Sequence, residues 1–231
     1  MYRVFEFDLA RNALKYAVVK FDIKKMHIPY YLCDVIRHTL ISAGCKPEFY
    51  HIDDNFFPAC EFSKNDYILY PNYWGVCAKN VEELVKTYPN LIVDNAHAYY
   101  DEPNGFACFN AGHKFGFKES YLWLKEDTLS QGGRDVFTIS KYDGAEERRK
   151  IFLALHRKYK NINKLSLDLN STPFCYPCLT SSIQEADNLV KNLKEEGKTV
   201  YRYWSPLPES FLEYKFYSRL VPIPILPDIS D

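Results

Sequence analysis

The chain has 231 residues, 47% of them hydrophobic, and a formal net charge of -1. This much apolar sequence can bury a core, in one large domain or in one domain with a small appendage, and it excludes a disordered chain. The balanced charges argue against nucleic acid or an anionic membrane as a partner. No run approaches the ~18 apolar residues of a membrane-spanning helix, and the first residues do not resemble a secretory signal, so we expect a soluble, cytoplasmic protein.

Short apolar runs alternate with helical patterns in the first half of the chain. In order, they predict a helix over 33–44, a strand over 47–53, a strand over 66–70, a helix over 80–88 and a strand over 91–93. Asn80 and Glu83 resemble a capping pair at the start of the second helix. The last strand, LIV, is apolar on both faces, as in a parallel sheet that helices cover on both sides. We therefore predict an α/β fold with a mostly parallel sheet flanked by helices.

The pattern changes after the GGR sequence at 132–134. It predicts a charged helix over 145–159, a strand over 173–179, a capped amphipathic helix over 182–197, a strand over 198–204 and at most an edge strand in the proline-rich tail over 220–231. We therefore expect a large domain over residues 1–140 and a small C-terminal α+β domain over 141–231.

Seven cysteines are scattered along the chain, an odd number that suits reduced, buried thiols better than a disulfide framework. Cys175 and Cys178 have the spacing of a redox pair or of half a zinc site. No second CxxC or HxxxH sequence accompanies them. We therefore expect these two cysteines to be structural, and we predict no metal site.

A carboxylate follows the predicted strand over 91–93. Ligands of open parallel sheets bind beyond the carboxyl ends of the strands, so Asp94 lies where a ligand would be. A charge at that position needs a partner. The cationic ring nitrogen of a cofactor would serve, and so would an arginine, a helix N-terminus or a backbone donor.

A lysine follows in the segment FNAGHKFGF, among small and aromatic residues. Such surroundings lower the pKa of an amine and favour the neutral form, so Lys114 could form a Schiff base. A strand-end aspartate with such a lysine twenty residues later is the arrangement that pyridoxal phosphate (PLP) enzymes need. The aspartate keeps the pyridine nitrogen protonated, and the lysine carries the cofactor and moves protons. The spacing alone does not identify such an enzyme.

Four segments together carry a resemblance to a known family: ARNALKYAV, HIPYYLCDVIRHTLISAGCKPEFYHID, VDNAHA and FNAGHKFGF. They resemble segments of the DegT/DnrJ/EryC1/StrS family, fold-type-I PLP-dependent aminotransferases that act mostly on nucleotide-linked keto-sugars. The match covers most of residues 5–125, and more loosely STPFCYPCL and YRYW. The resemblance implies transfer of an amino group, with glutamate as the expected donor, to a keto-sugar in surface-polysaccharide or secondary-metabolite sugar biosynthesis.

The resemblance also assigns roles to residues around the cofactor. Lys114 would be the Schiff-base lysine, and Asp94 would pair with the pyridine nitrogen. His97 falls where the family has a glutamine or histidine that contacts the ring near its phenolic oxygen. Asp94 and Lys114 would thus bind opposite ends of one aromatic cofactor.

The resemblance also implies residues that contact the phosphate and the face of the cofactor ring. Ala10 and Arg11 match the turn whose backbone N–H groups bind the cofactor phosphate. The segment containing Tyr31 and Cys33 supplies a residue that stacks on the ring, and either of the two could be that residue.

The chain departs from the family pattern at several positions. Phe109 and Ala111 stand where relatives carry a phosphate-binding serine, and the Gly-Asp-Gly-Gly run that usually follows the lysine is missing. His113 is treated as a neighbour of the lysine, and Trp74 as either a pocket wall or a core residue. Two alternatives stay open, namely another PLP-dependent reaction such as a sugar dehydratase and a non-catalytic relative that acts as a binding or scaffold protein.

The aromatic content bears on assembly. Aromatic residues make up 16% of the chain, more than one modest core would ordinarily need, and they are enriched in buried interfaces. Fold-type-I relatives build each cofactor pocket at a subunit interface. We therefore expect a homodimer with shared active sites, acting on small-molecule substrates.

Overall fold

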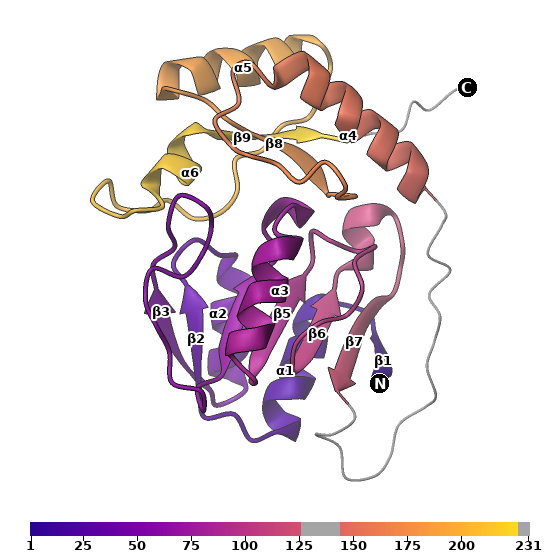
Figure 1. The fold of residues 1–231 in the computed structure, drawn as a ribbon, viewed down its shortest axis with the longest axis vertical. Helices are drawn as coiled ribbons and strands as arrows, with labels where there is room; N and C mark the ends of the chain where they lie inside the picture. The colour runs from indigo at the N-terminus through magenta and orange to yellow at the C-terminus, as the bar shows by residue number, and fades with distance from the viewer. Residues whose placement is uncertain (126–143, 226–231) are drawn as a thin grey trace.

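The computed structural model describes residues 1–125 and 144–225 of the chain (Figure 1). Its centre is a seven-stranded sheet with the strand order β1-β7-β6-β5-β4-β2-β3. The strands from β6 to β3 in that order are parallel, whereas β7 and β1 are antiparallel to their neighbours. The strands are β1 Tyr2–Phe7, β2 Lys25–Pro29, β3 Lys46–Tyr50, β4 Ile68–Pro71, β5 Leu91–Asn95, β6 Ala107–Asn110 and β7 Ser120–Lys125.

Helices cover both faces of this sheet. On one face α1 (Ala10–Lys20) and α2 (Asp34–Ser42) pack in the same core cluster as Ile92 of β5, and on the other α3 (Ala78–Thr87) shares a cluster with Leu91 and Val93. All five residues of β5 are buried. Successive side chains of β5 point to opposite faces of the sheet, and helices cover both faces, so the strand is apolar on both sides. The predicted α/β architecture is therefore confirmed.

The predicted capping pair of α3 is wrong. The helix begins at Ala78, with Cys77 at the N-cap, so Asn80 lies inside its first turn. Asn80 Nδ2 instead donates to the carbonyl oxygen of Asn55 at 2.7 Å and lies 3.1 Å from the hydroxyl of Tyr70. These tertiary partners compete with the local cap for the amide side chain.

The second part of the chain builds a small antiparallel hairpin and three helices. Its elements are α4 Ala145–Tyr159, β8 Cys175–Leu179, α5 Ile183–Glu195, α6 Tyr214–Arg219 and β9 Leu220–Pro224. Ser182 caps α5 by accepting a hydrogen bond from the backbone N–H of Glu185 at 3.1 Å, as its sequence predicts. The expected domain boundary near residue 140 lies outside the described residues.

The strand predicted over 198–204 is wrong, because the structure has no strand there. Tyr203 and Trp204 are packed instead against residues of the first part. The ring of Trp204 stacks on Trp74 at 5.4 Å between centroids, and the ring of Tyr203 meets Trp74 edge-on at the same separation. The alternating aromatic residues that suggested a strand instead make a long-range contact with Trp74.

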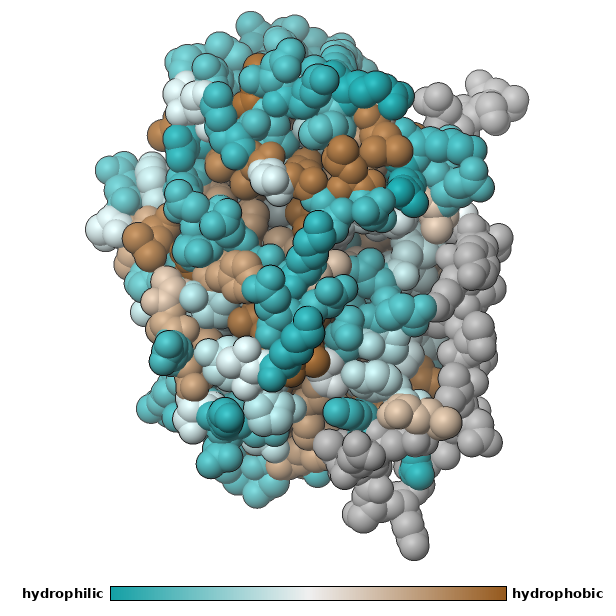
Figure 2. Space-filling view, in the orientation of Figure 1, coloured by the Kyte–Doolittle hydropathy of each residue, from teal (hydrophilic) through white to brown (hydrophobic). Residues whose placement is uncertain are grey.

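The small part lies over the carboxyl ends of the parallel strands (Figure 1). The backbone N–H of Phe174 points at the carbonyl oxygens of Trp74 and His97, at 3.1 Å from each. Glu213, fully buried at the start of α6, accepts a hydrogen bond from the backbone N–H of Ile52 at 2.6 Å. Figure 2 shows that the face turned to the viewer is mostly hydrophilic, with hydrophobic residues gathered in its upper half. The two parts are thus joined by buried polar bonds beside the region where ligands of such sheets bind.

The CxxC cysteines lie in β8, where residues three apart point to opposite faces of the strand. Both thiols are buried and free. Within residues 1–125 and 144–225 there is no cluster of three potential metal ligands, and no helix there is long and apolar enough to cross a membrane. Because their side chains point to opposite faces of β8, Cys175 and Cys178 are not placed to form a disulfide with each other or to bind one metal ion together.

Candidate active site

A cavity of about 270 Å³ opens beyond the carboxyl ends of the parallel strands. Leu32 and Cys33, which follow β2, and Pro71 and Asn72, at the end of β4, form part of its wall. The strands β2 and β4 are neighbours, but the chain leaves β2 towards β3 on one side and leaves β4 towards β5 on the other. Such a switch point is where open α/β sheets bind their ligands.

Asp94 reaches this cavity from β5. Its side chain is buried, and Oδ1 accepts a hydrogen bond from the backbone N–H of Ala96 at 2.8 Å. Burial raises the pKa of Asp94 to about 6, while the Ala96 N–H and the charge of Lys114 act in the opposite direction. The main chain is fixed as well, because the N–H of Asn72 donates to the Asp94 carbonyl at 3.0 Å. A buried carboxylate with so few donors is suited to a cationic partner in the cavity.

Lys114 lies in the 3₁₀ turn η2 (Gly112–Phe115) that follows β6, and it lines the same cavity. A Cβ at Gly112 would stand 1.9 Å from the carbonyl oxygen of Glu119, so only glycine fits this turn. Lys114 Nζ lies 5.0 Å from the ring centre of Phe174 and 5.6 Å from that of Tyr203. Burial lowers the pKa of the Lys114 ammonium, and Asp94 opposes this shift. The surroundings thus favour a neutral, nucleophilic amine.

His97 contacts the lysine directly. Its Nε2 lies 3.2 Å from Lys114 Nζ, and burial together with the charge of Lys114 lowers the pKa of His97 well below its ordinary value. The imidazole is therefore neutral and can accept a hydrogen bond from the amine. Its ring stacks on Trp74 at 5.3 Å and on Phe174 at 5.1 Å. Trp74 is fully buried behind His97 and is not among the residues that line the cavity, so its core role is the one that the structure supports.

The start of α1 provides the third polar region of the cavity. Ala10 and Arg11 line it, together with His113. The first turn of a helix has N–H groups without intrahelical acceptors, and its dipole favours an anion. Partial burial lowers the pKa of His113, and the charges of Lys114 and Arg11 add to this effect. Ala111 and Phe109 also line the cavity, so the wall lacks a hydroxyl at those two positions.

The structure separates the two candidates for the ring face. Cys33 lines the cavity, whereas Tyr31 is fully buried and stacks on Tyr73 at 5.9 Å between centroids. Its hydroxyl has a raised pKa because it is buried. Tyr31 therefore belongs to the core beneath the site.

Sequence reasoning missed several lining residues. Tyr203 and Trp204 close the cavity from the small part, and Asn72 lines it from the end of β4. Asn72 is anchored by its side chain, which donates to Asp101 at 2.8 Å and accepts from the Cys77 N–H at 2.9 Å. The one local signal for Asn72 was its position, because it is a polar residue that directly follows a strand, as Asp94 follows the predicted strand over 91–93.

The chemistry available in the cavity follows from these residues. A carboxylate, a desolvated amine and a neutral imidazole share one cavity with apolar and aromatic walls and a helix N-terminus. Such a set can hold a flat ring that has a basic nitrogen, a carbonyl carbon and an anionic substituent.

Comparisons with known proteins agree with this description of the fold. No protein-family model and no curated protein matches the sequence. Solved structures match over nearly the whole chain. One is a DegT DnrJ EryC1 StrS aminotransferase from Brucella abortus, with a TM-score of 0.72, 14% identity, and coverage of 99% of this chain and 82% of that one.

Two other solved structures resemble the chain to a similar degree. PseC of Helicobacter pylori, an aminotransferase involved in the biosynthesis of pseudoaminic acid, has a TM-score of 0.69 at 15% identity, with 96% of this chain and 81% of that one covered. Spr1654 from Streptococcus pneumoniae, in its PLP form, has a TM-score of 0.72 at 14% identity, with 99% and 83% covered. The chain therefore has the fold of the type-I PLP-dependent aminotransferases.

Proposed function

We propose that the chain is a PLP-dependent aminotransferase that acts on a sugar substrate. The observation that carries this proposal is that Asp94, His97 and Lys114 line one cavity at the switch point of the sheet. The fold of the similar solved structures, among which Spr1654 and CalS13 are named as sugar aminotransferases, supports it.

The residues of the cavity fit PLP. Asp94 would pair with the pyridine nitrogen, Lys114 would hold the aldehyde carbon, and the N–H groups at Ala10 and Arg11 would take the phosphate. The apolar walls at Leu32 and Phe109 suit the faces of a ring. Asp94 is suited to pair with the ring nitrogen, because burial raises its pKa and the Ala96 N–H and the charge of Lys114 offset this only in part. When bound, PLP supplies an electron sink for the amino-acid Cα–H bond.

The protein's own residues have distinct tasks in this reaction. Asp94, ionised beside a pyridinium, would hold a proton on the ring nitrogen. Lys114, whose pKa burial lowers, would take a proton at Nζ from the α-carbon of the bound amino acid and return it within the same half-reaction. His97, kept neutral, would receive a hydrogen bond at Nε2 and orient the amine. Tyr203 and Trp204 would exclude water from the cavity mouth.

The finer assignment concerns the two substrates. We propose glutamate as the amino donor and a nucleotide-linked keto-sugar as the acceptor. The segments that resemble the sugar aminotransferase family support this choice, as does the name of PseC among the similar structures. The product would be an amino sugar for a surface polysaccharide or a secondary metabolite.

The absorption spectrum of the purified protein with PLP tests the proposed function. We expect a visible band that Lys114→Ala abolishes and Lys118→Ala, a neighbouring lysine outside the cavity, leaves unchanged. Glutamate should then convert the cofactor to its amine form. A protein that takes up no PLP would favour a binding or scaffold role, and uptake without conversion by any amino acid would favour another PLP-dependent reaction.

We also propose a homodimer that completes the cavity. Val35, at the start of α2, lines the cavity and is 40% exposed, and Ile41 on the same helix is 56% exposed. Apolar side chains that remain exposed at the rim of a site suit a partner surface. Sedimentation at low concentration, with and without PLP, should show a dimer, and a monomer with full activity would refute the shared site.

A further inference from the structure

The imidazole of His97 lies among nearly parallel aromatic rings. Its plane is inclined by 17° to that of Trp74, by 13° to that of Phe174 and by 2° to that of Trp204, with ring centres 5.3, 5.1 and 5.9 Å away. The ring of Tyr203 meets the imidazole edge-on, with 6.0 Å between the ring centres. Trp74 belongs to the first part of the chain, and the other three rings belong to the small part. Both parts therefore restrict the orientation of this imidazole.

Trp74 is the innermost of these rings. Lys114 lines two cavities, the one described above and a neighbouring one of about 410 Å³. Trp74 is fully buried and is not among the residues that line either cavity, whereas each of the other three rings lines one or both. A ring in this position can influence a bound molecule only through the side chains in front of it, of which His97 is one.

The turn that carries Trp74 packs against the main chain of His97. Trp74 lies in η1 (Tyr73–Gly75) with a φ of 59°, a left-handed conformation that a bulky aromatic residue adopts only where its surroundings compensate the strain. A Cβ at Gly75 would stand 2.2 Å from the carbonyl oxygen of His97, so this contact requires glycine. The Phe174 N–H, which points at the carbonyl oxygens of Trp74 and His97, ties the two main chains together. The indole is thus fixed against the imidazole by its own backbone.

The polar atom of the indole does not explain this position. Trp74 Nε1 is buried and has no hydrogen-bond acceptor within residues 1–125 and 144–225. The contacts of the side chain are instead ring contacts, with His97 and Trp204 stacked on it and Tyr203 edge-on to it. The ring faces of Trp74 are therefore the part of the side chain that the surrounding structure uses.

The plane of the imidazole decides where Nε2 of His97 points. This atom lies 3.2 Å from Lys114 Nζ. The lone pair of an unprotonated imidazole nitrogen lies in the ring plane, and a hydrogen bond weakens steeply when donor and acceptor are misaligned. Rotation of the ring would therefore break the contact with the amine, and the stacked faces of Trp74 and Phe174 oppose that rotation. A neutral imidazole that accepts at Nε2 carries its proton on Nδ1.

We propose that Trp74 is a positioning residue, which fixes the imidazole plane of His97 and thereby the direction of the hydrogen bond at Lys114. Trp74 itself would touch neither substrate nor cofactor. This inference rests on the proposed function, because that reaction gives His97 and Lys114 their tasks. Without the indole face the imidazole would rotate, Nε2 would lose the amine, and the proton would be distributed over both ring nitrogens.

Nitrogen NMR spectra of the cofactor-free protein, with isotope-labelled histidine, test the proposal without any turnover. They report which ring nitrogen carries the proton, and His97→Gln identifies the signals of His97. We expect the proton on Nδ1 in the wild type and on both nitrogens in Trp74→Leu. Trp74→Phe keeps a ring face and should restore the wild-type spectrum. The matched control Trp123→Leu removes another buried indole, whose ring lies 5.8 Å from that of Tyr121, and should leave the His97 signals unchanged.

Steady-state kinetics of the PLP-loaded protein provide a second readout. Trp74→Leu should lower kcat by about tenfold with little change in KM, because a misplaced amine slows the chemical step more than it weakens substrate binding. Trp74→Phe should recover most of kcat, and Trp123→Leu should lose little of it. An equal loss of kcat in Trp123→Leu would overturn the proposal, since damage to the core would then be the cause.

Two measurements keep the proposal testable if Trp74→Leu does not fold. Trp74→Met fills the space with a flexible side chain that has no ring face, and it should show the same change at His97. An unchanged His97 spectrum in either variant, with the fold verified by circular dichroism, would overturn the proposal. Protons on both nitrogens of His97 in the wild type would overturn it without any variant. PLP uptake, read by absorbance, tests the proposed function separately, because the spectra of His97 do not depend on the cofactor.

Discussion

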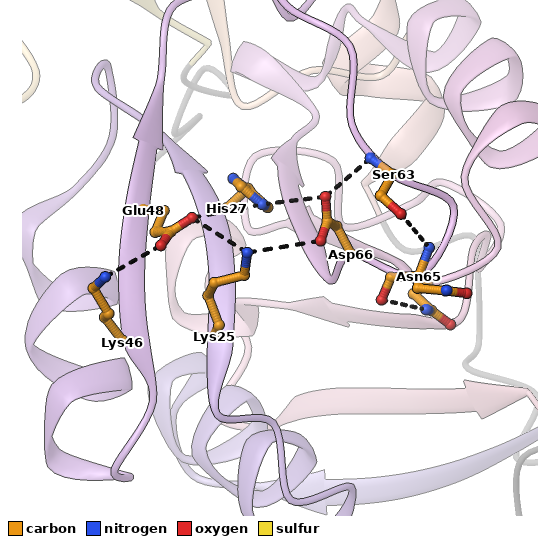
Figure 3. A network of polar contacts seen from close by, with 8 residues as sticks. Lys25, His27, Lys46, Glu48, Ser63, Asn65 and Asp66 are labelled. Atoms are coloured by element: carbon orange, nitrogen blue, oxygen red, sulfur yellow. Dashed lines mark hydrogen bonds and ion pairs between the residues drawn. The ribbon is translucent and has the colours of Figure 1, made fainter.

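The charged residues at the two ends of the parallel strands differ in how they are paired and buried. Toward the amino ends of β2 and β3, Lys25, Lys46, Glu48 and Asp66 form a network of ion pairs around His27 (Figure 3). Lys25 Nζ lies 3.4 Å from Glu48 Oε2 and 3.8 Å from Asp66 Oδ1. At the carboxyl ends, Asp94 and Lys114 line a cavity in which burial shifts the pKa of each toward its neutral form.

The difference shows which charges matter for function. Exposed ion pairs contribute little to stability, because water and salt screen them and replace either partner. Buried charges without full pairing destabilise the fold, so their retention at a switch point indicates that a ligand completes them. Substitutions at the carboxyl ends should therefore change chemistry and stability together, whereas substitutions in the network should change neither greatly.

The largest effect is expected for Asp94→Asn. A neutral amide cannot keep the ring nitrogen protonated, so turnover should fall by several orders of magnitude, or more than ~4 kcal/mol of barrier at 1.36 kcal/mol per decade. Steady-state transamination rates measure this. Asp101→Asn is the matched control, because Asp101 is a second carboxyl whose pKa burial raises to about 6 but which does not line the cavity. Near-normal turnover by Asp94→Asn would show that the carboxylate is structural.

The same substitution should remove a pH dependence of stability in the cofactor-free protein. The pKa of Asp94 is raised from 3.8 to about 6, so the folded state binds more protons than the unfolded state between these values. The free energy of unfolding should therefore fall as pH rises from about 4 to 6, by about 3 kcal/mol from this group. Urea unfolding should show Asp94→Asn gaining stability over the wild type across this range. A difference independent of pH would contradict the raised pKa.

A smaller effect is expected at His97. His97→Leu removes the acceptor that lies 3.2 Å from Lys114 Nζ, and leaving a buried donor without its partner costs about 1–3 kcal/mol. Turnover should fall by about ten- to a hundredfold. His97→Gln keeps an acceptor and should recover most of the rate, which a purely packing role of the ring would not allow.

The smallest effect is expected in the network at the other end of the sheet. Lys25→Ala should lower the free energy of unfolding by less than about 1 kcal/mol, since its side chain is 46% exposed. PLP uptake should be unchanged. A loss of cofactor binding in this variant would mean that the two ends of the sheet are coupled.

Local patterns predicted part of the fold, and they assigned no element to β1, β2, β6, β7, α1 or α6. The helix expected over 145–159 has those bounds, and the buried strand β5 was visible as an apolar run. The strand expected over 198–204 failed because Tyr203 and Trp204 pack on His97 and Trp74, residues more than a hundred positions away in the sequence. Hydrophobic periodicity records which side chains are apolar, and it does not record which distant surface they meet.

The site was predictable to the extent that motifs mark it. Asp94, His97 and Lys114 lie together as their segments suggested. The choice between Tyr31 and Cys33 needed the direction of side chains in the turn after β2, which no periodicity fixes. Trp204 reaches His97 only through the packing of the small part over the sheet, so no local pattern could reveal it.

The position of the covalent link to the cofactor tests the central claim most directly. The protein should be incubated with PLP, reduced with borohydride and mapped by peptide mass spectrometry. We expect the pyridoxyl group on Lys114, since this partly buried lysine shares the cavity with Asp94 and His97, and no label at that peptide in Lys114→Ala. A pyridoxyl group on Lys118 or Lys125 instead would contradict the assignment of this cavity as the active site.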